Sequence, residues 1–337
     1  MDILFGTHPK FMEHDAGSGH PEQPARLDAV LAGVEVSGVS EGIGFFAPEP
    51  ATMADLYRVH EPAYVDALRR FCLMGGGQLD PDTAVSVASW DAALLAAGSG
   101  LDAVRRLRAG EASAAFLAVR PPGHHAVVDR AMGFCLINNV AVTAASLVAE
   151  GERVLVLDYD AHHGNGTQDI FYREPNVLYV SFHQYPLYPG TGRADEVGAG
   201  DGLGTTVNIP VPADTTLGTY LAAIDEIVAP VVDNFAPTWV IASAGFDGHR
   251  DDPLTELGLT AQDFGDLTSW LFSVVPPGRR IAFLEGGYDL RALKLSSAST
   301  LAAMAGERLM AEKPSNGEAR LPVVRAIREA RARSLEL

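Results

Sequence analysis

Cysteine is scarce in this chain of 337 residues, which contains two, Cys72 and Cys135, and no CxxC pair. A disulfide framework is therefore excluded, and a reducing cytoplasm is the setting that this composition predicts. The sequence also lacks any run of about eighteen apolar residues, the minimum for a transmembrane helix. Its first residues show no basic flank followed by an apolar stretch, so neither an export signal nor a membrane anchor is predicted.

Positive charge is also in short supply. Lys and Arg number 25 against 43 Asp and Glu, which gives a formal net charge of -18 at pH 7. Such a surface repels phosphate backbones and anionic headgroups, so we exclude nucleic acid and membranes as main partners. Cationic ligands such as lysine tails and polyamines remain compatible with this charge, although an acidic surface is most often a matter of solubility.

Apolar segments of two kinds alternate along the chain. Short runs rich in β-branched residues end in polar or glycine-rich stretches and predict buried strands, while the segments between them have helical spacing. This alternation is typical of an α/β protein, here a three-layer α/β/α sandwich around a central, mainly parallel sheet. The predicted strands lie in "AAFLAVR" (114–120), "RVLVLDYD" (153–160), "NVLYVSFH" (176–183), "TWVIASAGFD" (238–247) and "RIAFLEGGYD" (280–289), and the predicted helices at 136–150, 217–235 and 260–275.

A single domain is predicted for residues 1–337. No internal repeat, low-complexity tract or long Ser/Gly linker divides the chain, whose loosest stretch is 312–320. The final segment, 321–337, has helical spacing and mixed charge. We expect it to form a terminal helix that packs on the body or on another subunit of a homo-oligomer.

Ionisable side chains follow four of the predicted strands, at the end where active sites form in parallel sheets. Because side chains two apart on a strand share a face, Asp160 and His162 can grip one ion. Asp247 would complete a His/Asp/Asp set with an open position for water, which suits a catalytic metal. Each group alone could instead cap a helix or satisfy buried backbone, but together with Asp158 these carboxylates would repel one another without a cation.

Two further features belong to the same edge of the sheet. His124 and His125 follow a proline-rigidified turn in "RPPGHHA", where two adjacent histidines are less easily explained as structural than one. Tyr288 follows Gly286 and Gly287, whose missing side chains let the backbone approach a ligand and let the tyrosine swing over it. A core tyrosine below a turn is the alternative interpretation.

Six blocks of the sequence occur in the order found in one known family. They resemble the signature blocks of the histone deacetylase superfamily, which includes bacterial histone-deacetylase-like amidohydrolases and acetylpolyamine amidohydrolases. The resemblance runs from "HPEQPARL" at 20–27 to about residue 300, and the "RPPGHHA" form is more similar to the class II and polyamine branches than to class I. The blocks are "RPPGHHA", "GFCLINNVAV", "LDYDAHHGNGTQDIFY", "VSFHQYPLYPGTG", "SAGFDGHRDDPL" and "LEGGYD".

The resemblance implies a zinc-dependent deacetylase that hydrolyses an N-acetyl amide to acetate and a free amine. Asp160, His162 and Asp247 would be the zinc ligands, although such a site also accepts Fe²⁺ or Co²⁺. His125 would be the general base and later the general acid, and Tyr288 would donate a hydrogen bond to the substrate carbonyl.

Further roles follow from the resemblance alone. It implies that His124 is an electrostatic partner oriented by Asp158, and that Asn165, lying behind His125, elevates the pKa of that histidine less than an aspartate would. A potassium ion is implied near the zinc, held by Asp158, the Ser181 hydroxyl and the main-chain oxygens of Asp160, His162 and Phe182. The acyl-lysine channel is implied to be lined by Gly133, Phe134, Tyr188 and Gly287, with Leu254 at its mouth.

Several alternatives stay open from the sequence. An apolar Leu254 favours acetyl-lysine substrates over acetylpolyamines, because it offers no charge to a distal ammonium. Asp80 and Asp82 could supply that charge instead, although capping a turn is the simpler role for them. Two other hypotheses fit these motifs: an arginase-like manganese hydrolase and a non-catalytic acyl-lysine binding module.

Overall fold

An eight-stranded sheet forms the centre of the molecule in a computed structural model that describes residues 2–336. Every neighbouring pair of strands in it is parallel, and the order is β2-β1-β5-β10-β9-β6-β7-β8. This confirms the predicted α/β fold. The strands are β1 (Ile3–Gly6), β2 (Ile43–Phe46), β5 (Ala114–Leu117), β6 (Val154–Asp158), β7 (Val177–Gln184), β8 (Thr206–Val211), β9 (Trp239–Ala244) and β10 (Arg280–Leu284).

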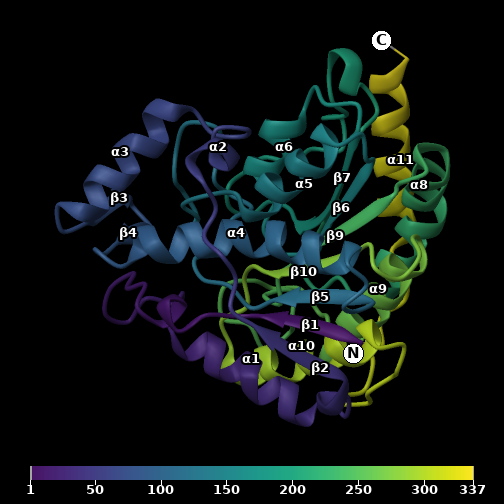
Figure 1. Ribbon diagram of the computed structural model, residues 1–337. Coiled ribbons are helices and arrows are strands. Elements are labelled where there is room, and N and C mark those ends of the chain that lie inside the picture. The colour runs from purple at the N-terminus through teal and green to yellow at the C-terminus, as the bar shows by residue number, and fades with distance from the viewer. Residues whose placement is uncertain (1, 337) are drawn as a thin grey trace.

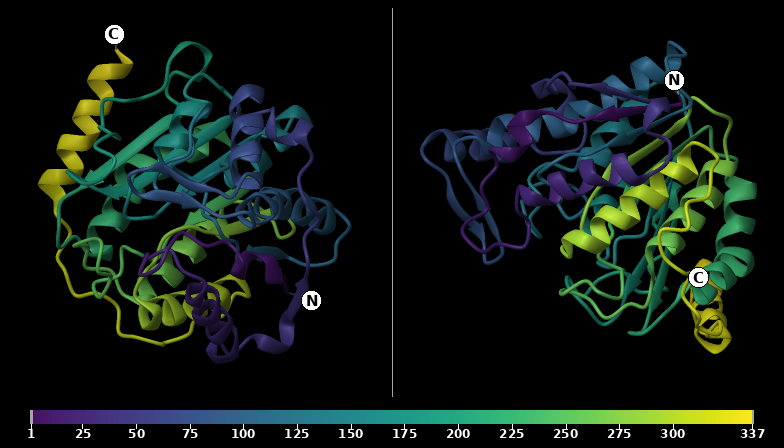
Figure 2. Two further views of the ribbon diagram at one scale, coloured as in Figure 1. Left: turned by 90° about the vertical axis from the view of Figure 1, so that its left-hand side faces the viewer. Right: turned by 90° about the horizontal axis from the view of Figure 1, so that it is seen from below.

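Helices cover both faces of the sheet (Figures 1 and 2). On one face α1 (Ala25–Val36), α10 (Leu290–Met304) and α9 (Ala261–Ser273) pack side by side. On the other face lie α4 (Ser89–Arg108), α5 (Asn139–Ala149) and α6 (Asn165–Phe171). Strands buried on both sides need apolar residues at every position, which explains why the central strands read as continuous apolar runs.

Three strands of the central sheet and one predicted helix depart from the sequence prediction. β1, β2 and β8 were not predicted. β2 and β8 are the two edge strands, where β2 is only partly buried and β8 carries Pro210. The helix predicted at 217–235 is divided into α7 (Leu217–Ala223), a π turn (Ile224–Val228) and α8 (Ala229–Phe235). Pro230 follows the π turn and lacks the N–H that a continuous α-helix would use there.

An arm extends from one side of the sandwich, at the left of Figure 1. It consists of α3 (Pro62–Leu73) and a hairpin of β3 (Gly77–Asp80) and β4 (Thr83–Val85), with the short α2 (Met53–Leu56) before it in the chain. The turn of the hairpin carries Asp82, whose carboxylate accepts the Gly133 N–H at 3.2 Å. The arm thus brings a carboxylate to the loop that follows β5.

The terminal helix α11 (Leu321–Leu335) packs on α7 and β8. Val324 and Ile327 are buried there, and Arg331 donates to the backbone oxygens of Gly204, at 2.7 Å, and Thr206.

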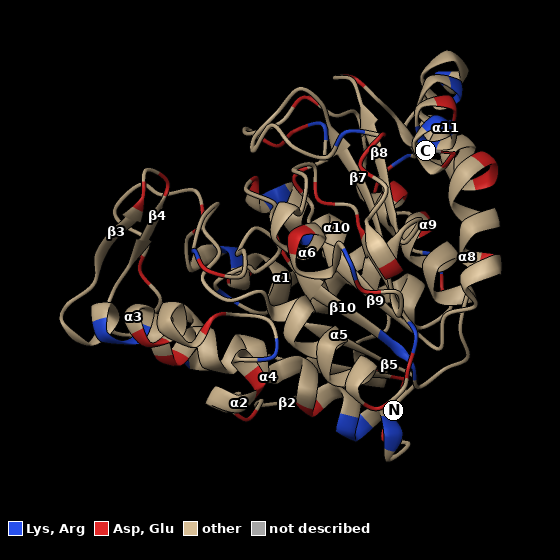
Figure 3. Cartoon of the chain, turned by 90° about the horizontal axis from the view of Figure 1, so that it is seen from above, with Lys and Arg blue, Asp and Glu red and all other residues tan. Residues whose placement is uncertain are grey.

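Short 3-10 segments occur at Pro9–Met12, Ser40–Gly42 and Gly200–Gly202. Between residues 2 and 336, none of the helices combines the length and the apolar character needed to cross a membrane. Acidic residues lie on many loops and helix ends, with Lys and Arg among them (Figure 3).

Candidate active site and metal centre

Asp160, His162 and Asp247 converge at the carboxyl ends of the neighbouring strands β6 and β9. His162 Nδ1 lies 2.8 Å from Asp247 Oδ2 and 3.2 Å from Asp160 Oδ1. One potential ligand atom from each of the three residues lies within 4.8 Å of the others. The structure therefore brings together the set that the sequence pattern proposed as a metal site.

Backbone N–H groups hold the two carboxylates of this cluster in place. Gly286 N–H donates to Asp160 Oδ2 and Ala161 N–H to Asp247 Oδ1, both at 2.8 Å. A Cβ atom on Gly286 would lie 2.5 Å from Asp247 Oδ2 and 2.6 Å from Asp160 Oδ2. Glycine is required at this position because any side chain would occupy the space between the two carboxylates.

The charges of the cluster are those of a site that fits a cation. Burial disfavours a charged His162, but the carboxylates of Asp247 and Asp160 outweigh it and raise the pKa of His162 to about 10. Burial and the neighbouring Asp160 raise the pKa of Asp247 to about 7. A divalent ion would neutralise both carboxylates and displace the imidazole proton, so two carboxylates and one imidazole form a suitable donor set.

The two adjacent histidines have different environments. His124 Nδ1–H donates to Asp158 Oδ2 at 3.0 Å, and His125 Nδ1–H to Asn165 Oδ1 at 2.8 Å. Burial disfavours the charged form of His124, but the carboxylates of Asp160 and Asp158 outweigh it and raise its pKa to about 10. Burial and the nearby His124 hold the pKa of His125 well below its usual value. The surroundings thus favour the charged form of His124 and the neutral form of His125.

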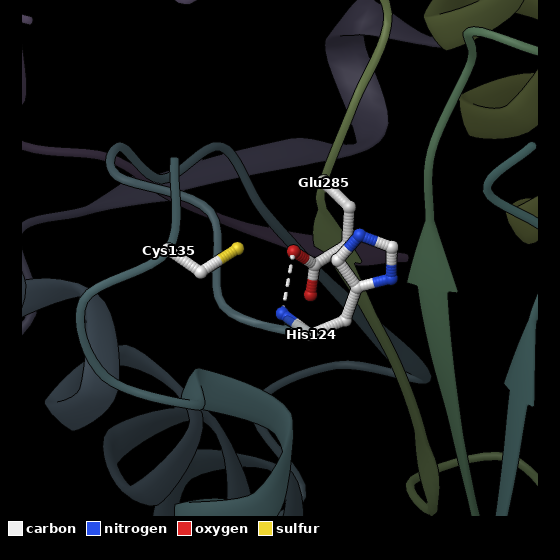
Figure 4. Close-up of side chains that lie close together, drawn as sticks. All are labelled: His124, Cys135 and Glu285. Atoms are coloured by element: carbon white, nitrogen blue, oxygen red, sulfur yellow. Dashed lines mark hydrogen bonds between the residues drawn. The ribbon is translucent and has the colours of Figure 1, made fainter. Parts of the chain in front are cut away.

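A buried carboxylate, Glu285, supports the histidine loop and was not singled out from the sequence. Its Oε2 accepts the backbone N–H groups of Gly123 at 2.7 Å and His124 at 3.2 Å (Figure 4). Burial raises the pKa of Glu285 to about 7. Cys135 lies beside it, but the Nδ1 of the neighbouring His124 already donates to Asp158, so we do not interpret this trio as a metal site. The sequence signal that could have pointed to Glu285 is its place directly after strand β10.

A cavity of about 210 Å³ opens above these groups. The Tyr188 ring stands edge-on to His125 with centroids 5.2 Å apart, and the Phe134 ring edge-on to Tyr288 at 5.8 Å. Leu254 is 36% exposed and Tyr188 37%, so both also face solvent. The lining residues are Asp82, His124, His125, Gly133, Phe134, Asp160, His162, Leu187, Tyr188, Leu254 and Tyr288.

The residues proposed from the sequence differ in their position relative to the cavity. Nine of them line it, together with Leu187, which was not proposed, and Asp82, which was proposed only as a substitute charge. Asp247 lies behind the wall at the metal cluster. Gly287 does not line the cavity; it has a φ of 116°, and a Cβ there would come within 3.0 Å of Phe246 Cβ. Asp80 is not part of the lining either.

Of the residues proposed for potassium, Asp158 ends β6, and Ser181 and Phe182 lie on β7. Asp160 and His162 belong to the metal cluster in the loop after β6. Asp158 and Ser181 are paired across β6 and β7. Asp158 Oδ2 accepts the Tyr179 hydroxyl at 3.1 Å, and Ser181 Oγ lies 2.9 Å from His183 Nδ1. Both side chains are fully buried.

Comparisons with known proteins agree with this geometry. The histone deacetylase domain family matches residues 20–304 of the chain. The chain belongs to the histone deacetylase family. A probable deacetylase of Archaeoglobus fulgidus is 42% identical over 92% of this chain and 88% of its own length. The histone deacetylase-like amidohydrolase of Pseudomonas aeruginosa is 33% identical over 90% of this chain and 82% of its own.

A solved structure extends the family relation to the whole fold. The crystal structure of the HDA15 HD domain has a TM-score of 0.90 to this chain and 36% sequence identity. It covers 100% of this chain, which in turn covers 95% of that domain. As a histone deacetylase family member the chain has the activity class of a deacetylase or amidohydrolase.

Proposed function

We propose that this chain is a zinc-dependent deacetylase that cleaves N-acetyl amides of the acetyl-lysine type and releases acetate and a free amine. The observation that carries the proposal is the meeting of Asp160, His162 and Asp247 with His125 and Tyr288 at one cavity. The acetylpolyamine amidohydrolase reaction is the alternative within the same chemistry.

Zinc, when bound by Asp160, His162 and Asp247, would supply a Lewis acid for the amide carbonyl and lower the pKa of a water molecule. Fe²⁺ and Co²⁺ suit the same donor set, and availability selects among them. A potassium ion at Asp158 and Ser181 is part of the proposal, because two fully buried oxygen donors stand there side by side.

His125 is the proton acceptor in this scheme. Its Nδ1–H is engaged by Asn165, which leaves Nε2 free to take a proton from the attacking water. The water oxygen forms a bond to the carbonyl carbon, the C–N bond breaks, and the proton returns to the leaving nitrogen. His124 stays charged beside Asp158 and adds a fixed positive charge close to the reacting carbonyl.

Tyr288 donates a hydrogen bond to the oxyanion that develops in the transition state. Burial raises the pKa of this phenol well above its usual value, although the nearby Arg26 opposes the effect. Its hydroxyl therefore keeps its proton at neutral pH and stays a donor throughout the reaction.

The acyl chain is held between the Phe134 and Tyr188 rings, in an apolar passage that excludes water from the reacting groups. Leu254 presents no charge to a second ammonium group. The Asp82 carboxylate is engaged by the Gly133 N–H and by the Thr83 hydroxyl at 2.7 Å, which leaves it less free to bind a polyamine. These contacts favour acyl-lysine over acetylpolyamine.

The test combines metal analysis with turnover. Purified chain is analysed for bound metal, and acetate release is measured from acetyl-lysine peptides, acetylputrescine and acetylspermidine. We expect near-stoichiometric zinc and a higher kcat/KM for the peptides. A metal-loaded chain that turns over none of these substrates would contradict the proposal, and a strong preference for polyamines would select the alternative. Bound manganese with hydrolysis of a guanidinium substrate would indicate arginase-like chemistry.

A further inference from the structure

One buried carboxylate joins the two loops that carry Leu254 and Tyr288. Asp252 lies in the loop after β9 and is 6% exposed. Its Oδ2 accepts the backbone N–H of Tyr288 at 2.7 Å and of Asp289 at 3.3 Å, while its Oδ1 accepts the N–H of Leu254 at 3.0 Å. Asp252 thus links the loops that follow two neighbouring strands.

The turn before Tyr288 is also held through its own backbone carbonyls. The buried Arg26 donates to the Gly287 carbonyl at 2.7 Å, and the Phe246 N–H donates to the Gly286 carbonyl at 3.0 Å. Gly286 and Gly287 contribute no side chains, and the Gly286 N–H is used by Asp160 at 2.8 Å. Asp289 turns its own side chain to the Ala292 N–H at the start of α10. Asp160, Arg26 and Phe246 therefore hold the turn that precedes Tyr288, and Asp252 holds the N–H of Tyr288 itself.

We propose that Asp252 is a positioning residue that sets the Tyr288 phenol and the Leu254 side chain relative to each other and to the metal cluster. The inference rests on the proposed function for what these two side chains do. Buried carboxylates are costly unless hydrogen-bonded, and here three backbone N–H groups supply the bonds. Such an anchor couples the catalytic hydroxyl to the mouth of the cavity.

The neighbouring Asp251 provides a matched control. Its side chain is 52% exposed, and within residues 2–336 its one ion-pair contact is with His249 Nδ1 at 3.9 Å. Asp251→Asn removes the same charge one residue away without touching either loop anchor. We expect it to leave kcat, KM and metal content unchanged.

Asp252→Asn tests the proposal directly. An amide has one accepting oxygen, so its NH₂ group must face an N–H from one of the two loops. We expect kcat on an acetyl-lysine peptide to fall roughly 10- to 100-fold through misplacement of the phenol. KM should change less, and zinc stoichiometry should stay that of the unmodified chain. An unchanged kcat, or a loss of zinc that accounts for the fall, would overturn the proposal.

A double-mutant cycle separates positioning from general damage. In the Tyr288→Phe background, where no hydroxyl is left to place, Asp252→Asn should lower kcat less than about threefold. An equal loss in both backgrounds would show that Asp252 does not act through Tyr288. If Asp252→Asn does not fold, Asp252→Glu, which moves both oxygens out by one methylene, serves in the same cycle.

Amide hydrogen exchange gives a readout that needs no turnover. In Asp252→Asn, peptides covering 252–256 and 286–290 should exchange faster together, while Asp251→Asn leaves both unchanged. If neither peptide exchanges faster, Asp252 does not hold the two loops, whatever the substrate of the enzyme is. Absence of deacetylation with the exchange result intact would instead contradict the proposed function alone.

Discussion

The two ends of the central sheet both carry charged residues, but in different surroundings. At the carboxyl end, Arg120 after β5 is fully buried and donates to Glu22 Oε2 and to the Phe11 carbonyl, both at 2.7 Å. At the amino end, Arg108 pairs with Glu150 and, at 3.1 Å, with Glu152, and its side chain is 38% exposed. Composition alone does not distinguish these two arginines.

The difference shows which charges the protein depends on. Buried charges at the carboxyl end are held by backbone groups as well as by one another, and losing one partner leaves another uncompensated. Exposed pairs at the amino end exchange their partners for water at little cost. Removing a charge should therefore be costly at one end of the sheet and nearly neutral at the other.

Asp247→Ala should produce the largest effect, because it removes one of the three proposed zinc ligands at the carboxyl end of the sheet. We expect activity to be abolished and zinc to become substoichiometric while the chain stays folded, as checked by metal analysis, circular dichroism and acetate release. Full zinc occupancy in this variant would refute the ligand assignment.

Arg120→Ala should be the largest loss of stability. Removing one partner of a buried ion pair costs about 3–5 kcal/mol of unfolding free energy. Urea titration of the variant beside the unmodified chain measures this cost. A loss of unfolding free energy below about 1 kcal/mol would be typical of a surface ion pair and would contradict the proposed difference between the two ends of the sheet.

Tyr288→Phe should lower kcat about 10²-fold with a smaller change in KM, because the lost hydroxyl acts in the transition state. Steady-state kinetics on one acetyl-lysine peptide measure both constants. Tyr188→Phe, which removes a hydroxyl from the cavity wall, is the comparison and should lower kcat much less. An unchanged kcat in Tyr288→Phe would remove the tyrosine from the mechanism.

Leu254→Glu should shift substrate choice. The new carboxylate can attract a distal ammonium, so kcat/KM for acetylspermidine relative to the peptide should rise roughly tenfold, or about 1.4 kcal/mol. Leu203→Glu adds the same charge at a 51% exposed position that does not line the cavity, and should leave the ratio unchanged. Equal shifts in both variants would assign the effect to overall charge.

Arg108→Ala should have the smallest effect of the five. An exposed ion pair contributes about 1 kcal/mol or less, and the amino end of the sheet lies away from the cavity. We expect unfolding free energy to fall by no more than that, with kcat unaffected. A loss comparable to that of Arg120→Ala would show that exposure does not explain the contrast.

Much of this fold was predictable because its central strands are buried on both faces. The runs before Asp158, Asp247 and Glu285 are mostly apolar, so they were recognised from the sequence alone. β1 and β2 were not recognised, and β2 lies at the sheet edge, where most of its residues are not fully buried. The π turn before Pro230 was also missed, because apolar spacing continues across it.

The candidate site was predictable to the same degree. Asp160 and His162 are close in sequence, and the rule that active sites lie at the carboxyl ends of parallel strands added Asp247 and Tyr288. Glu285 and Asp252 were not singled out. Both act on backbone N–H groups of other loops, and a carboxylate that holds a distant N–H has no sequence spacing by which to find its partner.

The sequence by itself determined the fold class, the chemistry of the strand ends and the family, because these depend on residue types in a fixed order along the chain. Only the tertiary structure showed which carboxylates lie close enough to share a cation, how the surroundings of the two histidines differ and which acids hold the loops. Those properties depend on burial and on distances between segments far apart in sequence, such as the 2.7 Å between Asp252 Oδ2 and the Tyr288 nitrogen. The strengths of electrostatic interactions and of hydrogen bonds vary steeply with burial and with distance. The order of the residues does not specify either burial or distance directly.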